Sequence, residues 1–415
     1  MRKILILVLL VSSQLSAWAG EKTIVVDLQS DSKVQATAAA LGATVLHNIP
    51  GTSLYLLKVP AVPEFQAQTL LGIQSVETDD AVKLRPQGAI GILKTSTSRP
   101  AEWYAQQPAM KLIGADKALA LAKGRGVVIA DLNARVDVGH PALIGHLTGG
   151  YDFVSEREAS GASLDQSSAS FLDQSSAAFL DQSSAAFLDQ SSAAFLDQST
   201  ASFLDAANPA HGHGTFCAAL LAVVAPESMI MPLQVFDDAG NADVFSIVKA
   251  IHYAVRNGAD VINMSFGLTS PSPAVKEAIA FAAERGVTVV ASAGNNDSKA
   301  PQYPAAYKDV LGATATDLQD KKASFSNYGE AIFVTAPGVN IVSAYPGGYY
   351  ALASGTSFSA ALVSGEAALL RSARWNGTSR AIAKGAVNID SKNPKYSGQL
   401  GSGRIDIMRS LQIVN

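Results

Sequence analysis

Cysteine is almost absent from this sequence, since Cys217 is the only one among 415 residues. A single cysteine excludes an intrachain disulfide, so a folded chain of this size must rely on a large hydrophobic core for its stability. Cys217 stands in the small, apolar stretch 216–224, which favours a buried packing role over that of a reactive thiol.

Charged residues are also scarce. They make up 16% of the chain against 48% hydrophobic residues, a balance that excludes an intrinsically disordered protein and indicates a globular one. The formal net charge is −4 and no block of Lys or Arg occurs, so we expect no nucleic acid or other polyanion as a partner.

Long hydrophobic runs are missing as well. The apolar run at residues 4–11 is far shorter than the ~20 residues that a membrane-spanning helix needs, so we expect no membrane span. Arg2 and Lys3 precede this run, and the small-x-small sequence 17–19 follows it. This arrangement predicts a signal peptide over residues 1–19, cleaved after Ala19, and a secreted or periplasmic (extracytoplasmic) protein.

The length of the chain favours two folded units. Residues 20–85 alternate short strands with helices, a pattern that predicts a small ferredoxin-like α+β domain. Its expected strands are 23–26, 54–59 and 82–84, and its expected helices are 34–41 and 65–71. Residues 86–108 are rich in Pro, Gly, Ser and Thr without periodicity, and we interpret them as a linker.

Residues 109–415 are expected to form a second, larger α/β domain. Continuous apolar strands are separated by amphipathic helices, which predicts a mostly parallel sheet covered on both faces. The clearest strands are 126–130, 261–264 and 287–291, and the clearest helices are 246–256 and 273–285. Ligands bind such sheets beyond the carboxyl ends of their strands, so the functional site is expected there.

An octapeptide repeat interrupts this domain at about residues 155–208. Leu-Asp-Gln-Ser recurs every eight residues, and the copies carry no His or Cys for catalysis. We interpret the repeat as a surface insertion, with a stacked β-type or turn-rich arm as the alternative. Its Ser and Asp side chains are suited to no more than weak cation binding.

Three short motifs carry the chemistry. His213 opens an apolar stretch, Asn295 follows the apolar strand 287–291, and Ser357 opens a helix of small residues at 359–370. A serine hydroxyl is a weak nucleophile that needs an adjacent imidazole to take its proton. The three motifs together therefore indicate nucleophilic catalysis at the rim of the sheet.

From about residue 108 to the end, the sequence resembles the subtilase family of serine proteases. Beyond the three motifs, the shared segments are 225–226, 263–267, 303–305, 325–329, 336–338 and 401–406. The resemblance implies a subtilisin-like three-layer α/β fold and hydrolysis of polypeptides through an acyl-enzyme. The N-terminal unit resembles the inhibitory propeptide of the family, which makes the chain's own propeptide an expected partner and the chain a zymogen.

The resemblance also assigns roles to residues. It makes Ser357 the nucleophile, His213 the general base and Asn295 a donor to the oxyanion, and it requires no cofactor for the chemistry. Structural calcium is compatible with it, although the sequence assigns no calcium site and no oligomeric state. Two segments of the family pair with the substrate backbone, and here they are Ser265, Phe266 and Gly267 on one side and Gly240, Asn241 and Ala242 on the other.

One motif departs from the family. An ungapped alignment through His140 and Pro141 places Asn133 where the family has the aspartate of its triad. Asp131 is the alternative acid, but it lies two residues earlier, ~7 Å along an extended strand, and reaches the histidine only after a slip. Three hypotheses therefore remain open: an active endopeptidase, a pseudoprotease that binds peptides, and a surface or adhesion protein acting through its repeat.

Overall fold

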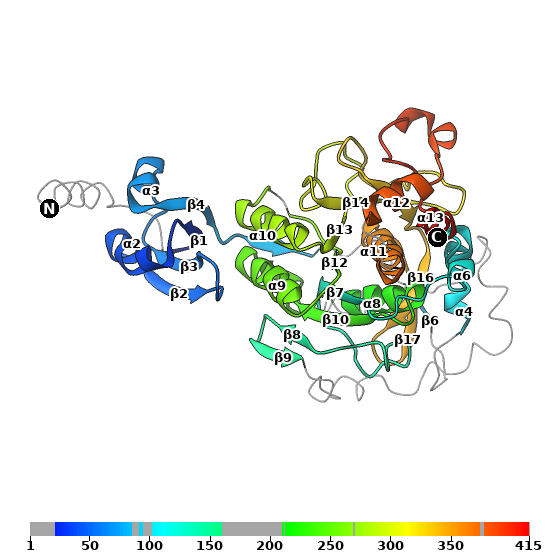
Figure 1. Ribbon diagram of the computed structural model, residues 1–415, viewed down its shortest axis with the longest axis horizontal. Coiled ribbons are helices and arrows are strands. Elements are labelled where there is room, and N and C mark those ends of the chain that lie inside the picture. Colours follow the sequence, from blue (N-terminus) through cyan, green and yellow to red (C-terminus); the bar gives the residue numbers. More distant parts are fainter. Residues whose placement is uncertain are drawn as a thin grey trace, which may run out of the picture.

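The computed structural model describes residues 21–84, 91–93, 102–159, 210, 212–268, 270–373 and 377–414. The predicted signal peptide, the octapeptide repeat from residue 160 onward and much of the predicted linker lie outside these residues. The described chain forms a small N-terminal domain and a larger domain, which are clearly separated in Figure 1.

The N-terminal domain is a four-stranded antiparallel sheet with two helices on one side, in the strand order β2-β3-β1-β4. In chain order the elements are β1 (Lys22–Leu28), α2 (Val34–Leu41), β2 (Thr44–Asn48), β3 (Leu54–Val59), α3 (Phe65–Leu71) and β4 (Ile73–Thr78). Both helices end at a glycine with positive φ, Gly42 and Gly72, a conformation that favours glycine. This arrangement confirms the predicted ferredoxin-like fold.

The larger domain is built on an eight-stranded sheet, in which every neighbouring pair is parallel except β8 and β9 at one edge. Its order is β15 (Val334–Pro337), β14 (Val310–Thr316), β13 (Thr288–Ser292), β12 (Val261–Met264), β7 (Val128–Asn133), β10 (Met229–Gln234), β8 (Gly150–Asp152) and β9 (Arg157–Ala159). The mostly parallel sheet predicted from the sequence is confirmed.

Helices cover both faces of this sheet (Figure 1). On one face, α8 (His213–Val224) and α11 (Thr356–Ser372) share a hydrophobic core with strand residues such as Ile129. On the other face, α9 (Val244–Arg256) and α10 (Pro273–Glu284) pack on the alternate residues, such as Ala130 and Leu132. Consecutive side chains of β7 therefore point into different cores, as the period of a strand requires.

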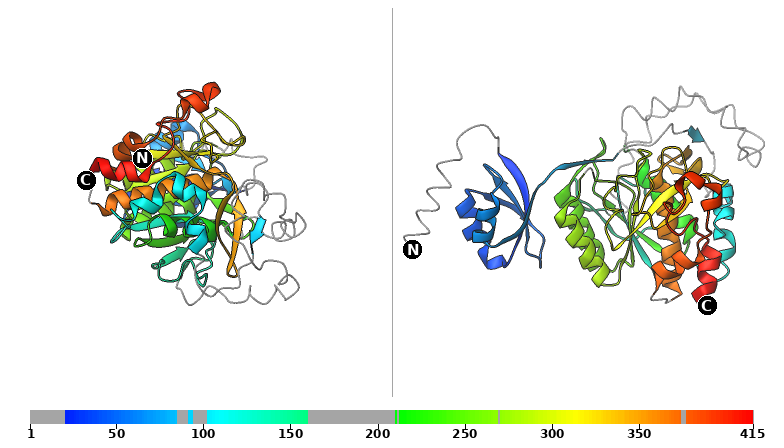
Figure 2. Two further views of the ribbon diagram at one scale, coloured as in Figure 1. Left: turned by 90° about the vertical axis from the view of Figure 1, so that its right-hand side faces the viewer. Right: turned by 90° about the horizontal axis from the view of Figure 1, so that it is seen from above.

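The two domains are joined by an extended strand (Figure 2). We predicted a strand at 82–84 within the N-terminal sheet, and that expectation was wrong. The structure places β5 (Ala81–Lys83) in an antiparallel pair with β11 (Asn241–Asp243) of the larger domain. The strand β4, which the sequence analysis missed, completes the N-terminal sheet in its place.

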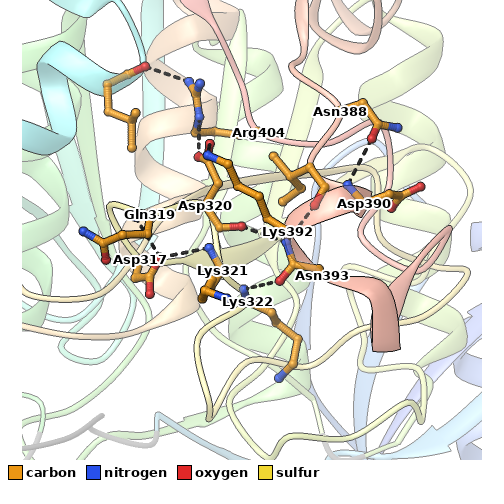
Figure 3. A network of polar contacts seen from close by, with 12 residues as sticks. Asp317, Gln319, Asp320, Lys321, Lys322, Asn388, Asp390, Lys392, Asn393 and Arg404 are labelled. Atoms are coloured by element: carbon orange, nitrogen blue, oxygen red, sulfur yellow. Dashed lines mark hydrogen bonds and ion pairs between the residues drawn. The ribbon is translucent and has the colours of Figure 1, made fainter.

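The C-terminal part of the chain is held by a polar network (Figure 3). Arg404 is almost fully buried; its Nε donates to Asp320 Oδ1 at 2.6 Å and its Nη1 donates to the Leu112 carbonyl at 2.7 Å. Lys392 forms a second ion pair with Asp320 at 2.8 Å. These contacts connect α5 (Pro108–Leu112) and the segment before α13 (Ile407–Val414) to the loop that carries Asp320.

A small three-stranded sheet and several short helices complete the domain. The sheet is formed by β16 (Ile341–Tyr345), β17 (Tyr349–Ala353) and β6 (Gly91–Leu93). The remaining helices are α4 (Glu102–Ala105), α6 (Ala115–Ala118) and α12 (Thr378–Gly385). The core in which α8 and α11 pack is thereby closed on the side away from the main sheet.

Candidate active site

The residues singled out in the sequence gather where the carboxyl ends of the central strands meet two helix starts. Asn133 ends β7, and Asn295 follows β13 by three residues. His213 is the first residue of α8 and Ser357 is the second residue of α11. Gly214 allows α8 to approach β7 closely, because a Cβ there would lie 2.3 Å from the carbonyl oxygen of Ala134.

His213 and Asn133 are in direct contact. The Nδ1 atom of His213 lies 2.6 Å from Oδ1 of Asn133. An amide oxygen only accepts hydrogen bonds, so Nδ1 must carry the proton and Nε2 must hold the lone pair. Nε2 is buried and has no hydrogen-bond partner among the described residues. In this tautomer, His213 is arranged to accept a proton at Nε2.

Three contacts determine the orientation of the Asn133 amide. Its Oδ1 accepts a hydrogen bond from the Ala134 N–H at 2.9 Å. Its Nδ2 donates to the carboxylate of Asp131, with distances of 3.2 Å and 3.4 Å to the two oxygens. A reversed amide would place its NH2 against the Ala134 N–H and its oxygen against a carboxylate, so the observed orientation is strongly favoured.

Asp131 bonds Asn133 and not the histidine. The parallel pairing of β7 with β10 and β12 runs past Asp131 without a shift in register, opposite Pro232 and Asn263. Among the described residues, the His213 ring has polar contacts with Asn133 and with the thiol of Cys217. The slip that the sequence analysis required for Asp131 to reach His213 is therefore not observed.

Ser357 is 95% buried, and its hydroxyl is hydrogen-bonded to Ser265 and not to Nε2 of His213. Its Oγ donates to the carbonyl oxygen of Ser265 at 2.8 Å, and its own carbonyl accepts from the Ser265 hydroxyl at 2.9 Å. A hydrogen bond from Ser357 to His213 therefore requires rotation of the serine side chain. Hydrogen bonds of catalytic groups are commonly loose or unformed before substrate binds.

Asn295 is oriented by the start of α11. Its Oδ1 accepts a hydrogen bond from the Thr356 N–H at 2.9 Å, which leaves the NH2 end of the amide available to a ligand. Asn295 and Ser357 line the same cavity of about 300 Å³. An amide N–H and the backbone N–H of Ser357, at the start of a helix, are both suited to stabilising a developing oxyanion.

The sequence analysis missed Gln302, whose side chain lies between two glycines at this cavity. A Cβ on Gly267 would lie 1.5 Å from Nε2 of Gln302, and one on Gly294 would lie 1.6 Å from its Oε1. Asn327 holds the Gln302 amide by donating to Oε1 at 3.2 Å. Gly267 was named as a substrate-pairing residue from the sequence, but only the fold brings residue 302 between it and Gly294.

Both segments expected to pair with substrate border the same region. Ser265, Phe266 and Gly267 line the cavity, together with Lys83 and Leu84 from the end of the N-terminal domain. On the other side, β11 pairs with β5, and the Leu84 N–H donates to the Gly240 carbonyl at 2.7 Å. The exit strand of the N-terminal domain therefore occupies a position at which an extended peptide can bind.

Two acidic residues of the N-terminal domain cap helices of the larger domain. Glu77 Oε1 accepts hydrogen bonds from the Ala274 N–H at 2.7 Å and from the Ser272 hydroxyl at 3.0 Å, at the start of α10. Asp79 Oδ1 accepts from the Phe245 N–H at 2.9 Å, at the start of α9. The N–H groups of a helix's first turn have no partner within the helix, and here two carboxyl groups of the N-terminal domain accept from them.

Burial sets the electrostatics of the site. It lowers the pKa of His213 to about 4, because the imidazolium is poorly solvated there. It raises the pKa of the Cys217 thiol well above its usual range, and the negative charge of Asp131 adds to that increase. Cys217 is fully buried, which agrees with the packing role predicted for it.

Within the described ranges, no cluster of three or more His, Cys, Asp or Glu side chains is arranged to hold a metal ion. The helices described in the same part of the chain include none that is long and apolar enough to span a bilayer.

The sequence matches the model of the Subtilase family over residues 124–403. It is 31% identical to thermitase from Thermoactinomyces vulgaris over 311 residues, which are 72% of this chain and 94% of the relative. It is 39% identical to subtilisin Savinase from Lederbergia lenta over 170 residues, which are 39% of this chain and 63% of the relative.

Among solved structures, the chain is similar to fervidolysin from Fervidobacterium pennivorans, described as a keratinolytic enzyme related to subtilisin. The TM-score is 0.70 at 23% identity, and the match covers 95% of this chain and 61% of that chain. The maturation protease PagA is similar with a TM-score of 0.53 at 24% identity. At these identities the two structures support the fold alone.

Proposed function

The chain belongs to the subtilase family of serine-type endopeptidases, and we propose that it is exported as a self-inhibited precursor whose nucleophile is Ser357. The observation that carries the proposal is the shared cavity. Ser357 and Asn295 line it together with Lys83 and Leu84, the last described residues of the N-terminal domain.

The proposed reaction begins when Ser357 Oγ turns from the Ser265 carbonyl toward Nε2 of His213. Nε2 takes the hydroxyl proton as Oγ forms a bond to the scissile carbonyl carbon. The oxyanion that forms is stabilised by Nδ2 of Asn295 and by the backbone N–H of Ser357. The intermediate then collapses: the C–N bond breaks, the imidazolium gives its proton to the leaving amine, and an ester to Ser357 remains.

Water completes the proposed cycle. Nε2 of His213 removes a proton from a water molecule, which attacks the ester carbon through a second oxyanion. The C–O bond to Ser357 breaks, and the serine oxygen recovers its proton from the imidazolium. Asn133 holds Nδ1–H throughout, so that Nε2 alone exchanges protons.

The N-terminal domain is proposed to act as the inhibitory propeptide. Its exit strand pairs with β11 as an extended substrate would, and its Glu77 and Asp79 cap α10 and α9. In the sequence, the predicted cleavage region, residues 86–108, follows shortly after Leu84. Recognition through backbone pairing favours extended polypeptides as the general substrate.

The alternatives raised by the sequence have less support. An inactive peptide-binding protein was suggested because Asn133 carries no charge, but it is the amide oxygen of Asn133 that faces Nδ1 of His213, which favours the tautomer that catalysis requires. An adhesion function through the octapeptide repeat concerns residues outside the described ranges.

Mass spectrometry of the exported protein tests the proposal. We expect the wild type to begin between residues 86 and 108, and Ser357→Ala to retain the N-terminal domain. Ser359→Ala is the matched control, because that serine lies in the same helix and donates to the Ala336 carbonyl rather than facing the cavity. The same cut in wild type and Ser357→Ala would show that another protease removes the domain.

A further inference from the structure

Asp131 is a buried acidic residue for which the reaction described above has no role. It lies in β7, at the centre of the parallel sheet, and none of its surface is exposed. No ion pair of the described residues includes it, so no cation offsets its charge. A buried carboxylate without a cation costs stability, which makes a functional role the better explanation for its presence.

Two amides bind the Asp131 carboxylate. Asn263 Nδ2 donates to Oδ1 at 2.8 Å, and Asn133 Nδ2 donates to the two oxygens at 3.2 Å and 3.4 Å. The Asn263 amide is itself held by the Ser364 hydroxyl, which donates to its Oδ1 at 2.9 Å. The carboxylate is therefore held in place by the neighbouring strand β12 and, through Asn263, by α11.

The contact with Asn133 reaches the histidine through one amide group. On one side the amide donates to Asp131, and on the other its Oδ1 accepts from Nδ1 of His213 at 2.6 Å. The carboxylate, the amide and the imidazole thus form one chain of hydrogen bonds. Such chains polarise each of their members, and more strongly inside a protein than in water.

We propose that Asp131 is the positioning residue of a two-part acid, in which Asn133 contacts His213 while Asp131 orients the amide and supplies the negative charge. The proposal rests on the proposed function, since it assigns Asp131 a role in the proton transfer of His213. Asp131 touches neither substrate nor the reacting atoms.

The carboxylate has two effects in this arrangement. The first is orientation, because losing the acceptor for Nδ2 would allow the amide to turn and present its NH2 to the ring, which favours the wrong tautomer. The second is charge. Across one amide, at an effective dielectric constant of about 20, a negative charge stabilises an imidazolium by about 10- to 100-fold. Asn133 alone supplies neither.

The titratable groups that face Asp131 are few. From α8, Cys217 feels the charge of Asp131, and His213 is reached through Asn133. The non-titrating Asn263 of β12 donates to Asp131 and is itself bonded to Ser265, which follows β12, and to Ser364 of α11. Pro232 of β10 lies opposite Asp131 in the sheet. Burial raises the pKa of Asp131 to about 6. The carboxylate is charged at neutral pH, and its contribution is expected to be lost as the pH falls through about 6.

Nitrogen NMR of the His213 ring tests the proposal without relying on activity. The full chain carrying Ser357→Ala is the background, labelled at histidine and assigned with His213→Gln. We expect Asp131→Asn to keep the Nδ1–H tautomer and to change the nitrogen resonances of His213 at pH 7.5, where Asp131 is charged in the wild type, but not at pH 5, where Asp131 is neutral. Asp131→Leu removes the acceptor as well, and is expected to yield a mixture of tautomers.

The rate at which the full chain removes its own N-terminal domain provides a second, kinetic test. Asp131→Asn is expected to slow removal of the N-terminal domain about 10- to 100-fold at pH 7.5, and to remove the loss of rate near pH 6. The double variant Asp131→Asn/Asn133→Asp exchanges charge and amide within the pair, and is expected to restore the rate. Because Asn133→Asp places an aspartate directly against His213, the pH profile of the single variant is the discriminating result: a purely structural role for Asp131 predicts that Asp131→Asn keeps the loss of rate near pH 6.

Asp152→Asn changes another buried aspartate of the same sheet and should leave both the His213 signals and the processing rate unchanged. Unaltered His213 signals in Asp131→Asn, or a folded double variant as slow as the single one, would overturn the proposal. A wild type that never processes itself would refute the proposed function, while the NMR result would still decide the role of Asp131.

Discussion

Glu366 is expected to make the native state less stable as the pH rises, and replacing it should remove that effect. This residue of α11 is fully buried, and neither of its carboxylate oxygens has a hydrogen-bond partner among the described residues. Burial raises its pKa from 4.5 to about 8, an increase that the neighbouring Ser410 hydroxyl only partly offsets. Glu366 is therefore neutral in the native state at pH 7 but ionised in the unfolded chain.

The sign and size of the effect follow from proton linkage. Because the folded pKa is raised, the wild type is most stable below the unfolded value and loses stability as the pH rises toward 8. Each pH unit in that window lowers the free energy of unfolding by about 1.4 kcal/mol. At pH 7, ionisation of Glu366 in the unfolded chain therefore lowers it by about 3 kcal/mol in total. Glu366→Gln retains the shape of the neutral acid and does not titrate.

Urea unfolding of the Ser357→Ala chain, with and without Glu366→Gln, measures the effect. We expect the advantage of the glutamine variant to grow by about 2 to 3 kcal/mol between pH 5 and pH 7. Glu284→Gln, an exposed position on α10, is the control and should change little. An advantage that is the same at both pH values would refute the reasoning, because it would mean that Glu366 is ionised in the folded protein.

Three further predictions concern the site. Burial, followed by repulsion from Asp243, raises the pKa of Asp79 to about 6 in the docked state, so the cleaved N-terminal domain should bind more tightly at pH 5 than at pH 7.5. Gel filtration at both pH values checks this, and Asp79→Asn should flatten the difference. Gln302→Gly should enlarge the cavity beside Gly267 and Gly294 and shift cleavage of a peptide library toward larger side chains; an unchanged profile would exclude Gln302 as a determinant. Asn295→Ala should lower kcat by roughly 10²–10³, with KM little changed, if its amide serves the oxyanion.

Local patterns predicted much of the fold. The apolar strand at 261–264 was predicted with the bounds that the structure has, and the helices at 34–41 and 65–71 were as well. Their signals are contained in short stretches of sequence: continuous apolar residues for a buried strand, and a terminal glycine for each helix. The mostly parallel sheet followed from the alternation of such strands with helices.

What the sequence did not predict depends on contacts between distant segments. The strand near residue 82 was expected in the N-terminal sheet, yet it pairs with residues 241–243, and nothing in its own composition indicates that partner. Gln302 was overlooked for the same reason. Alignment placed Asn133 at the acid position, but the direction of its amide depends on Asp131 and on the Ala134 N–H, and an amide has two orientations of nearly equal shape.

The central claim is that Ser357 is an activated nucleophile although an asparagine contacts the catalytic histidine. Reaction of the processed, purified protein with a fluorophosphonate probe, followed by peptide mass spectrometry, tests it most directly, since the probe labels only an activated serine. The account predicts one modified peptide, carrying the label on Ser357, and no labelling of denatured protein. A processed, folded protein that remains unlabelled, or that carries the label on another serine, would contradict it.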